Sequence, residues 1–97
     1  MRVSFGKLTG SVGDGEKNME IMVNGKVVGL ISVFYRMRHI GATRRKEHIP
    51  TDVEGYVEGL GEYTFGAMQT IDEHTSLADA IAYVKAQIRM YAAMLAE

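Results

Sequence analysis

The stretch from Ser76 to Glu97 has the clearest hydrophobic periodicity in this chain. Its large apolar residues recur at spacings of four and three, the repeat of a helix with one buried face. They are Leu77, Ile81, Val84, Ile88, Tyr91 and Leu95. Ser76 is a suitable N-cap residue, and alanines without any glycine or proline favour the helix throughout. The pattern therefore predicts one long amphipathic helix at the C-terminal end.

The opposite side of this predicted helix is less polar than a solvated surface usually is. It combines small and large apolar side chains, namely Ala82, Tyr83, Ala86, Met90 and Ala93. Alanine on any face can simply hold a helix at low entropic cost. The alternative is that these residues form a self-association or partner surface.

A period of two replaces the helical period in the middle of the chain. Met19 to Val23 alternates, and Asn24-Gly25 then gives the strongest short-range signal for a β-hairpin. The returning segment, Lys26 to about Met37, is long and rich in β-branched residues, which indicates the central strand of a sheet. Strict alternation places Val27, Ile31, Val33, Tyr35 and Met37 on one side and Val28, Leu30 and Phe34 on the other.

Weaker patterns complete the sheet. Val3 and Phe5 indicate a first strand within residues 2–9, and a glycine-rich hairpin loop follows over residues 10–17. Residues 52–60 fit helical spacing, but their glycines favour a strand or an irregular segment. Tyr63 to Ala67 indicates the last strand, and Asp72 to Thr75 a turn before the helix.

Residues 36–51 lose the alternation, contain Gly41 and Pro50, and concentrate charge. These features predict a long exposed loop between two strands. The fold class that follows is α+β: a single domain, residues 1–97, with an antiparallel sheet of three to five strands and the C-terminal helix packed on one face. The uncovered sheet face would then favour dimerisation or the binding of a partner.

Composition bears on the cellular location of the protein. The chain has 97 residues and no cysteine, which excludes disulfides and thiolate chemistry and favours the cytoplasm. No signal-peptide pattern is present at Met1 to Phe5, and the longest apolar run is too short to span a bilayer. We therefore expect a soluble, cytoplasmic protein that does not insert in membranes.

Charge is unevenly distributed although the net charge is only −1. Residues 36–48 contain five cationic side chains and one carboxylate, a charge of +4 that leaves −5 for the remainder. The cations are Arg36, Arg38, Arg44, Arg45 and Lys46. Such a basic loop can follow a nucleic-acid backbone, can contact an acidic protein surface, or can simply be solvated.

A row of carboxylates follows the basic segment. Glu54, Glu58 and Glu62 fall on one side of the chain whether it is a helix or a strand, and Asp52 extends this row. The row can keep an edge strand soluble. It can also enter a positively charged protein groove that normally holds phosphates.

Catalytic patterns are weak. His39, His48 and His74 lie in separate segments without the spacing that directs two imidazoles to one metal. Asp72, Glu73 and His74 precede a helix, where acidic and polar residues are common for capping reasons. We therefore expect a protein without catalytic residues, metal or cofactor.

The segment Met19-Glu-Ile-Met-Val-Asn-Gly-Lys-Val-Val-Gly-Leu-Ile31, followed by a polar connection, a glycine-rich strand and Ser76-Leu-Ala-Asp-Ala-Ile-Ala-Tyr-Val84, resembles small accessory proteins of bacterial viruses and mobile elements. These include the anti-CRISPR inhibitors, which share no common motif, so no binding residues can be transferred. The resemblance implies a phage-type inhibitor in the host cytoplasm that binds a nucleic-acid-handling host protein or ribonucleoprotein, such as a CRISPR-Cas effector. The alternatives are a direct nucleic-acid-binding protein and a structural homodimer.

Overall fold

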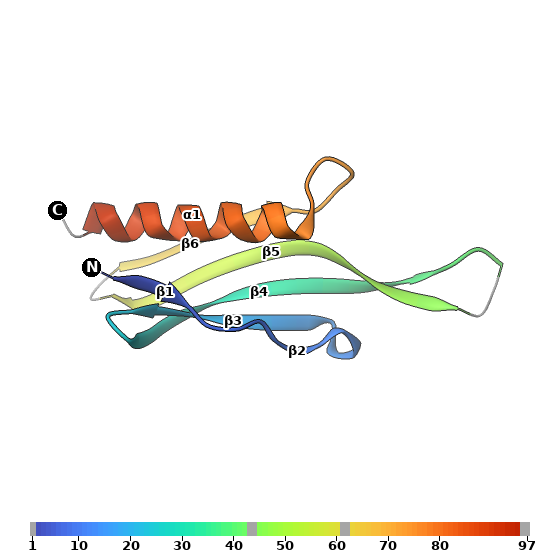
Figure 1. Ribbon diagram of the computed structural model, residues 1–97, viewed down its shortest axis with the longest axis horizontal. Coiled ribbons are helices and arrows are strands. Elements are labelled where there is room, and N and C mark those ends of the chain that lie inside the picture. The colour runs from blue at the N-terminus through green and yellow to red at the C-terminus, as the bar shows by residue number, and fades with distance from the viewer. Residues whose placement is uncertain (1, 43–44, 61–62, 96–97) are drawn as a thin grey trace.

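The computed structural model describes residues 2–42, 45–60 and 63–95 and has one helix packed against an antiparallel sheet (Figure 1). The first part of the chain forms β1 (Val3–Phe5), β2 (Thr9–Ser11), a short 3-10 helix η1 (Val12–Asp14) and β3 (Glu16–Val23). The remaining elements are β4 (Lys26–His39), β5 (Lys46–Leu60), β6 (Tyr63–Thr70) and α1 (Leu77–Leu95). The predicted α+β class is confirmed.

The strands lie in the order β1-β3-β4-β5-β6, and β2 also pairs with β3. All pairings are antiparallel. From β3 to β6, each strand also lies beside the strand that follows it in sequence. β4 occupies the middle position, as its length and composition predict. The first edge differs from expectation, because the two short strands β1 and β2 share it where the sequence indicates one strand.

The hairpin signals correspond to real turns. Asn24 and Gly25 have φ values of 52° and 82°, which a type I′ turn requires, and join β3 to β4 as predicted. The predicted glycine-rich hairpin loop is the connection from β2 to β3, in which Ser11 pairs with Glu16 around η1. The segment of uncertain type, residues 52–60, is a strand within β5.

A β-bulge changes the predicted sides of β4. Ile21 pairs with Gly29 and Met22 pairs with Val27, so Val28 has no direct partner. The extra residue shifts the alternation by one position. Val28 is therefore buried on the same side as Ile31 and Val33, and Val27 is half-exposed. The sequence-based assignment of Val27 and Val28 to these sides is wrong, because a bulge between two valines leaves no signal in the hydrophobic pattern.

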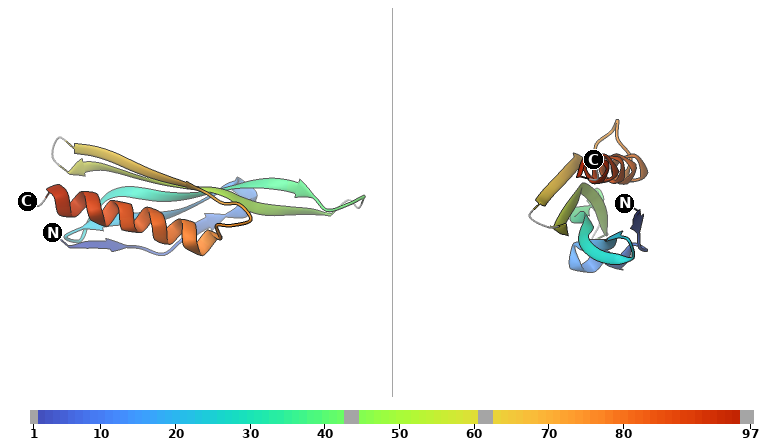
Figure 2. Two further views of the ribbon diagram at one scale, coloured as in Figure 1. Left: turned by 90° about the horizontal axis from the view of Figure 1, so that it is seen from above. Right: turned by 90° about the vertical axis from the view of Figure 1, so that its left-hand side faces the viewer.

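Helix α1 packs on one face of the sheet and chiefly contacts β5 and β6 (Figure 2). The six residues of the predicted stripe are all buried or partly buried, and Ala80 and Ala92 extend the packed surface. The backbone N–H of Asp79 donates to Oγ of Ser76 at 3.1 Å, which confirms the predicted N-cap. The core lies between this stripe and the inward side of β3, β4 and β5.

Most of the predicted loop over residues 36–51 is instead strand, because β4 continues to His39 and β5 begins at Lys46; of the described residues, 40–42 and 45 lie in the connection between the two strands. The two strands pair from Phe34 opposite Asp52 to His39 opposite Lys46. Pro50 does not interrupt the pairing, because it lies beside a bulge where β6 has ended and no third strand needs its N–H group. The loop prediction is wrong for residues 36–39 and 46–51, because a ribbon that covers no core does not need to alternate apolar and polar residues.

Candidate binding surfaces

The paired residues 35–39 and 46–50, with residues 40–42 and 45 of their connection, form a two-stranded ribbon, called the arm below, that projects from the body of the protein (Figure 1). β3 ends opposite Phe34 and β6 ends opposite Asp52, so beyond this level β4 and β5 pair only with each other. Five residue pairs, from Tyr35–Pro50 to His39–Lys46, make up the paired part. The arm accounts for the elongated shape, 56 × 25 × 19 Å.

The base of the arm is attached at defined points. The N–H of Tyr35 donates to the carbonyl oxygen of Gly15 at 2.9 Å, and the N–H of Ile71 donates to that of Thr51 at 2.9 Å. Thr51 is the additional residue of a second bulge, and its hydroxyl donates to the carbonyl oxygen of Phe34 at 3.3 Å. A bulge increases the local twist of a ribbon. The arm therefore leaves the sheet where β4 and β5 lose their other partners.

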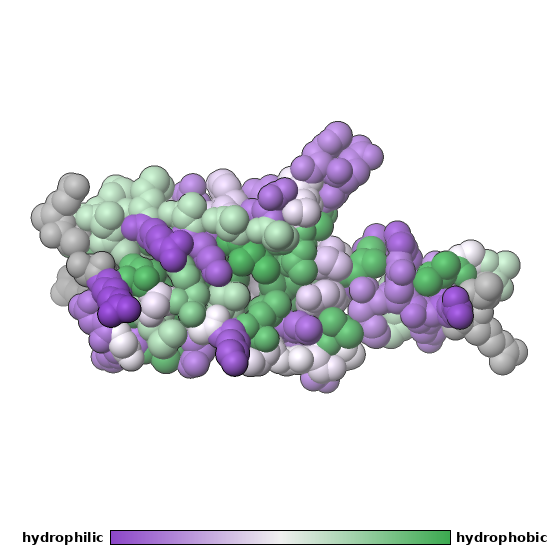
Figure 3. Space-filling view, in the orientation of Figure 1, coloured by the Kyte–Doolittle hydropathy of each residue, from purple (hydrophilic) through white to green (hydrophobic). Residues whose placement is uncertain are grey.

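Cationic side chains occur on both sides of the arm. Residues opposite each other in an antiparallel pair point to the same side, and successive residues alternate. One side consequently has Arg36, Arg38, Glu47 and Ile49, and the other has Met37, His39, Lys46 and His48. Arg38 forms an ion pair with Glu47, the residue directly opposite. Figure 3 shows that this part of the molecule is largely hydrophilic, with a few hydrophobic residues between the polar ones.

The predicted basic residues are thus collected on one protruding element. Arg36, Arg38, Arg45 and Lys46 are all exposed, and Arg44 lies outside the described residues. The sequence identifies the charge of this segment correctly. Its arrangement as a paired ribbon with two cationic sides was not predicted.

The predicted acidic row lies on the sheet face opposite α1, called the open face below. Asp52, Glu54 and Glu58 occupy alternate positions of β5, and Glu54 and Glu58 are exposed. Glu62 lies outside the described residues. Because alternate strand residues share one side, Asp52 and Glu54 have the common orientation that the spacing predicts, and Glu58 is exposed at a register irregularity between Val57 and Leu60.

Large apolar side chains accompany these carboxylates. Tyr56 is 52% exposed between Glu54 and Glu58, and Leu30 and Met68 are 43% and 57% exposed on the neighbouring strands. A shallow hollow of about 330 Å³ lies among them, lined by Glu54, Gly55, Tyr56, Gly66, Ala67 and Met68. Of these residues the sequence indicates only the carboxylate of Glu54. Tyr56 lacked a signal because the type of element over residues 52–60 was ambiguous, and Met68 because the predicted last strand ended at Ala67.

The predicted self-association residues of the helix, Ala82, Tyr83, Ala86, Met90 and Ala93, are all exposed. Tyr83 and Met90 remain about half-exposed, and Met94 is 61% exposed. This side of the helix is therefore unpacked in the single chain.

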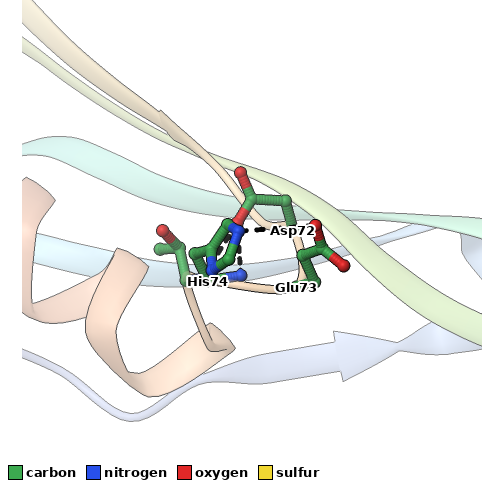
Figure 4. Close-up of polar contacts among 4 residues, drawn as sticks. Asp72, Glu73 and His74 are labelled. Carbon is green, nitrogen blue, oxygen red and sulfur yellow. Dashed lines mark hydrogen bonds and ion pairs between the residues drawn. The ribbon is translucent and has the colours of Figure 1, made fainter.

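The acidic segment before α1 has a structural arrangement (Figure 4). One carboxylate oxygen of Asp72 accepts the backbone N–H groups of His74 at 2.8 Å and Thr75 at 2.9 Å, which closes the predicted turn. Nε2 of His74 lies 3.4 Å from Oε1 of Glu73, but both side chains are more than four-fifths exposed. Within residues 2–42, 45–60 and 63–95, no group of three or more histidine, aspartate or glutamate side chains is placed to hold a metal ion.

No family model, curated protein or solved structure matches this chain. In the part of the chain that the structure describes, no helix combines the length and the apolar character needed to cross a membrane.

Proposed function

We propose that this protein is a non-enzymatic binding protein that contacts nucleic acid through the arm. The observation that supports this proposal is the projection of exposed arginine and lysine side chains on a two-stranded ribbon beyond the body. Phosphate contacts from such side chains supply most of the sequence-independent affinity for nucleic acid. Because the arm extends past all other strands, it can approach a duplex without a clash from the sheet or the helix.

The dimensions of the arm suit the major groove of duplex DNA. This groove is about 12 Å wide and about 8.5 Å deep, and it admits a two-stranded β-ribbon. Five residue pairs at about 3.4 Å per residue extend about 17 Å, which exceeds the depth of the groove. With cations on both sides, an inserted ribbon would face the phosphates of both strands.

The carboxylates of the body limit where nucleic acid can bind. Glu54 and Glu58 on the open face repel phosphates, so a duplex that contacts the arm would avoid that face. The net charge of −1 is therefore the sum of a positively charged arm and a negatively charged body. We accordingly expect binding that is weak overall, confined to the arm and strongly reduced by salt.

The test is the affinity for a fluorescently labelled DNA duplex, measured by anisotropy between about 20 and 200 mM salt. Arg36→Ala with Lys46→Ala removes one cation from each side of the arm. The plot of log K against log salt has a negative slope, and the double substitution should reduce the magnitude of this slope by about 1.8. Lys7→Ala with Lys26→Ala removes two exposed cations of the body and is the matched control. Absence of binding at low salt, or an equal effect of the control pair, would refute this function.

A second candidate function is supported by the open face. There the carboxylate row lies beside Tyr56 and Met68, a combination of charge and exposed apolar area that suits a basic protein groove. In this alternative the protein is a phage-type inhibitor that occupies the nucleic-acid channel of a host complex. A CRISPR-Cas effector is one such complex.

This alternative is tested by a tagged pull-down from bacterial lysate treated with nuclease. Glu54→Lys with Glu58→Lys should abolish capture of the host complex, and Glu73→Lys, which changes an exposed carboxylate away from the open face, should not. Capture that is insensitive to the reversal of Glu54 and Glu58 would rule out the open face. Retention of nucleic acid alone, removed by nuclease, would favour the arm.

A further inference from the structure

The two edges of the sheet differ in how well they are protected from pairing. One edge consists of β1 and β2, two strands of three residues each, separated by a segment that contains Lys7. Short strands and lysine are common means of blocking an edge. The other edge is β6, eight residues long, without any charged residue or proline from Tyr63 to Thr70. β6 therefore offers a backbone edge that nothing in its sequence protects.

The two flanks of α1 also differ: charged side chains lie on the flank toward β1, and an aromatic contact lies on the flank toward β6. Lys85 and Arg89 lie over the ring of Phe5 in β1, at 5.1 and 4.9 Å from its centroid, so this flank faces the β1 edge. On the other flank the ring of Tyr91 lies 5.0 Å from that of Phe65 in β6. The flank toward β1 is thus charged.

Next to Tyr91 on the β6 flank, four residues at spacings of four, three and four form a strip along the helix. They are Tyr83, Gln87, Met90 and Met94, none of them charged. Three of the four are large side chains about half-exposed or more. The exposed apolar strip of α1 therefore borders the unprotected edge of the sheet.

From this arrangement we infer that a second copy of this chain pairs with β6. The two β6 strands run antiparallel around a two-fold axis, extend the sheet across both copies, and bring the two α1 helices together on one face. An antiparallel edge is self-complementary under a two-fold axis, because the same residues of each copy supply both halves of the interface. Neither β6 nor the strip contains a charge, so the pairing opposes no like charges.

The spacing of the helices agrees with the side chains on the strip. Strands are about 4.8 Å apart, and α1 lies over β5 and β6. A two-fold axis at the β6 edge would therefore separate the two helix axes by about 10 to 14 Å. Helices in direct contact are about 8–10 Å apart, so long side chains have to fill the difference. Tyr83, Met90 and Met94 have that length, whereas Ala82 and Ala86 do not.

The inferred dimer places the two arms at opposite ends, because the two-fold axis reverses the direction of the strands. This inference does not depend on the proposed nucleic-acid contact. A failure of one therefore leaves the other intact.

The test is the molar mass in solution by light scattering, over a dilution series and without nucleic acid. The wild-type chain should have twice the chain mass. Thr64→Lys on β6 and Met90→Lys on the strip should each raise the dissociation constant at least tenfold. Met94→Lys is a second variant of the strip, should Met90→Lys fail to fold as judged by circular dichroism.

Two matched controls place the same lysine elsewhere. Ala82→Lys lies on α1 away from the strip, and Leu30→Lys lies on the open face of β4, so both should remain dimeric. A wild-type chain that is monomeric at the highest concentration would overturn the inference. Dissociation by Leu30→Lys or Ala82→Lys with no effect of Thr64→Lys would also overturn it, in favour of the open face or the outer helix face.

Discussion

A Cβ atom on Gly55 would lie 2.7 Å from Cδ1 of Ile88, so β5 and α1 approach each other at a position that only glycine fits. The same Cβ atom would lie 2.6 Å from Cγ1 of Val84. Val84 and Ile88 are almost completely buried, and each belongs to the apolar stripe of the helix. Gly55 thus permits the close packing of the helix on the strand that bears the acidic row.

Gly55→Ala should destabilise the fold by about 1–3 kcal/mol, because the added methyl group overpacks the contact between helix and strand. Chemical denaturation followed by circular dichroism measures this change. Ile88→Val in the same chain removes the opposing Cδ1 atom and should recover part of the loss. Gly13→Ala is the control, since its Cβ would meet only Oγ of Ser11 at 3.4 Å. Equal stabilities of Gly55→Ala and Gly13→Ala would contradict the tight contact.

Ser76→Ala should cost about 1 kcal/mol, because the N–H of Asp79 loses the hydroxyl that accepts it at the helix N-terminus. Ser76→Asp supplies another acceptor and should retain most of the stability. The free energies of unfolding of the two variants, measured in parallel, check the cap. A loss of equal size in both would mean that the hydroxyl has a different role.

The helix and the β3–β4 hairpin could be predicted because their signals are local. Helical spacing identifies the buried stripe of α1, and Asn24-Gly25 provides the two positive φ angles of the turn. The bulge at Val28 could not be predicted, since exchanging one valine for the next leaves the pattern apolar on both sides. The second edge strand β2 was missed because three exposed residues have no hydrophobic period.

The candidate sites, too, could be predicted from the sequence only in part. The arginines and the carboxylates are visible in the sequence as charges, but their placement depends on where strands end. Gly41 is a loop signal that holds, since it adopts a φ of 58° in the connection between β4 and β5, whereas Pro50 lies beside a bulge within the paired ribbon. The exposed strip beside β6 follows only from the flank that Tyr91 and Phe65 define. Tertiary arrangement, which no local pattern specifies, decides these positions.

Glu47→Gln should strengthen nucleic-acid binding and leave stability almost unchanged. The ion pair of Glu47 with Arg38 is exposed, so its loss should cost less than about 1 kcal/mol. Removing the carboxylate leaves Arg38 available for phosphate and should steepen the salt slope by up to about 0.9. Anisotropy titrations against duplex DNA measure the effect, with Glu73→Gln as the control at an exposed site outside the arm. An affinity equal to that of the wild type would argue against phosphate contact at Arg38.

Replacing residues 37–48 by Asn-Gly should remove the arm and leave the body folded. Arg36 and Ile49 are opposite each other in the ribbon, so a two-residue type I′ turn can join them. The core lies below this level, between α1 and the inward residues of β3 to β5, so cooperative thermal unfolding should persist. Binding to duplex DNA should be lost at all salt concentrations, whereas the molar mass in solution should be twice that of the shortened chain, because β6 and the strip on α1 are untouched. A shortened chain that binds DNA as well as the wild type would show that the contact lies on the body.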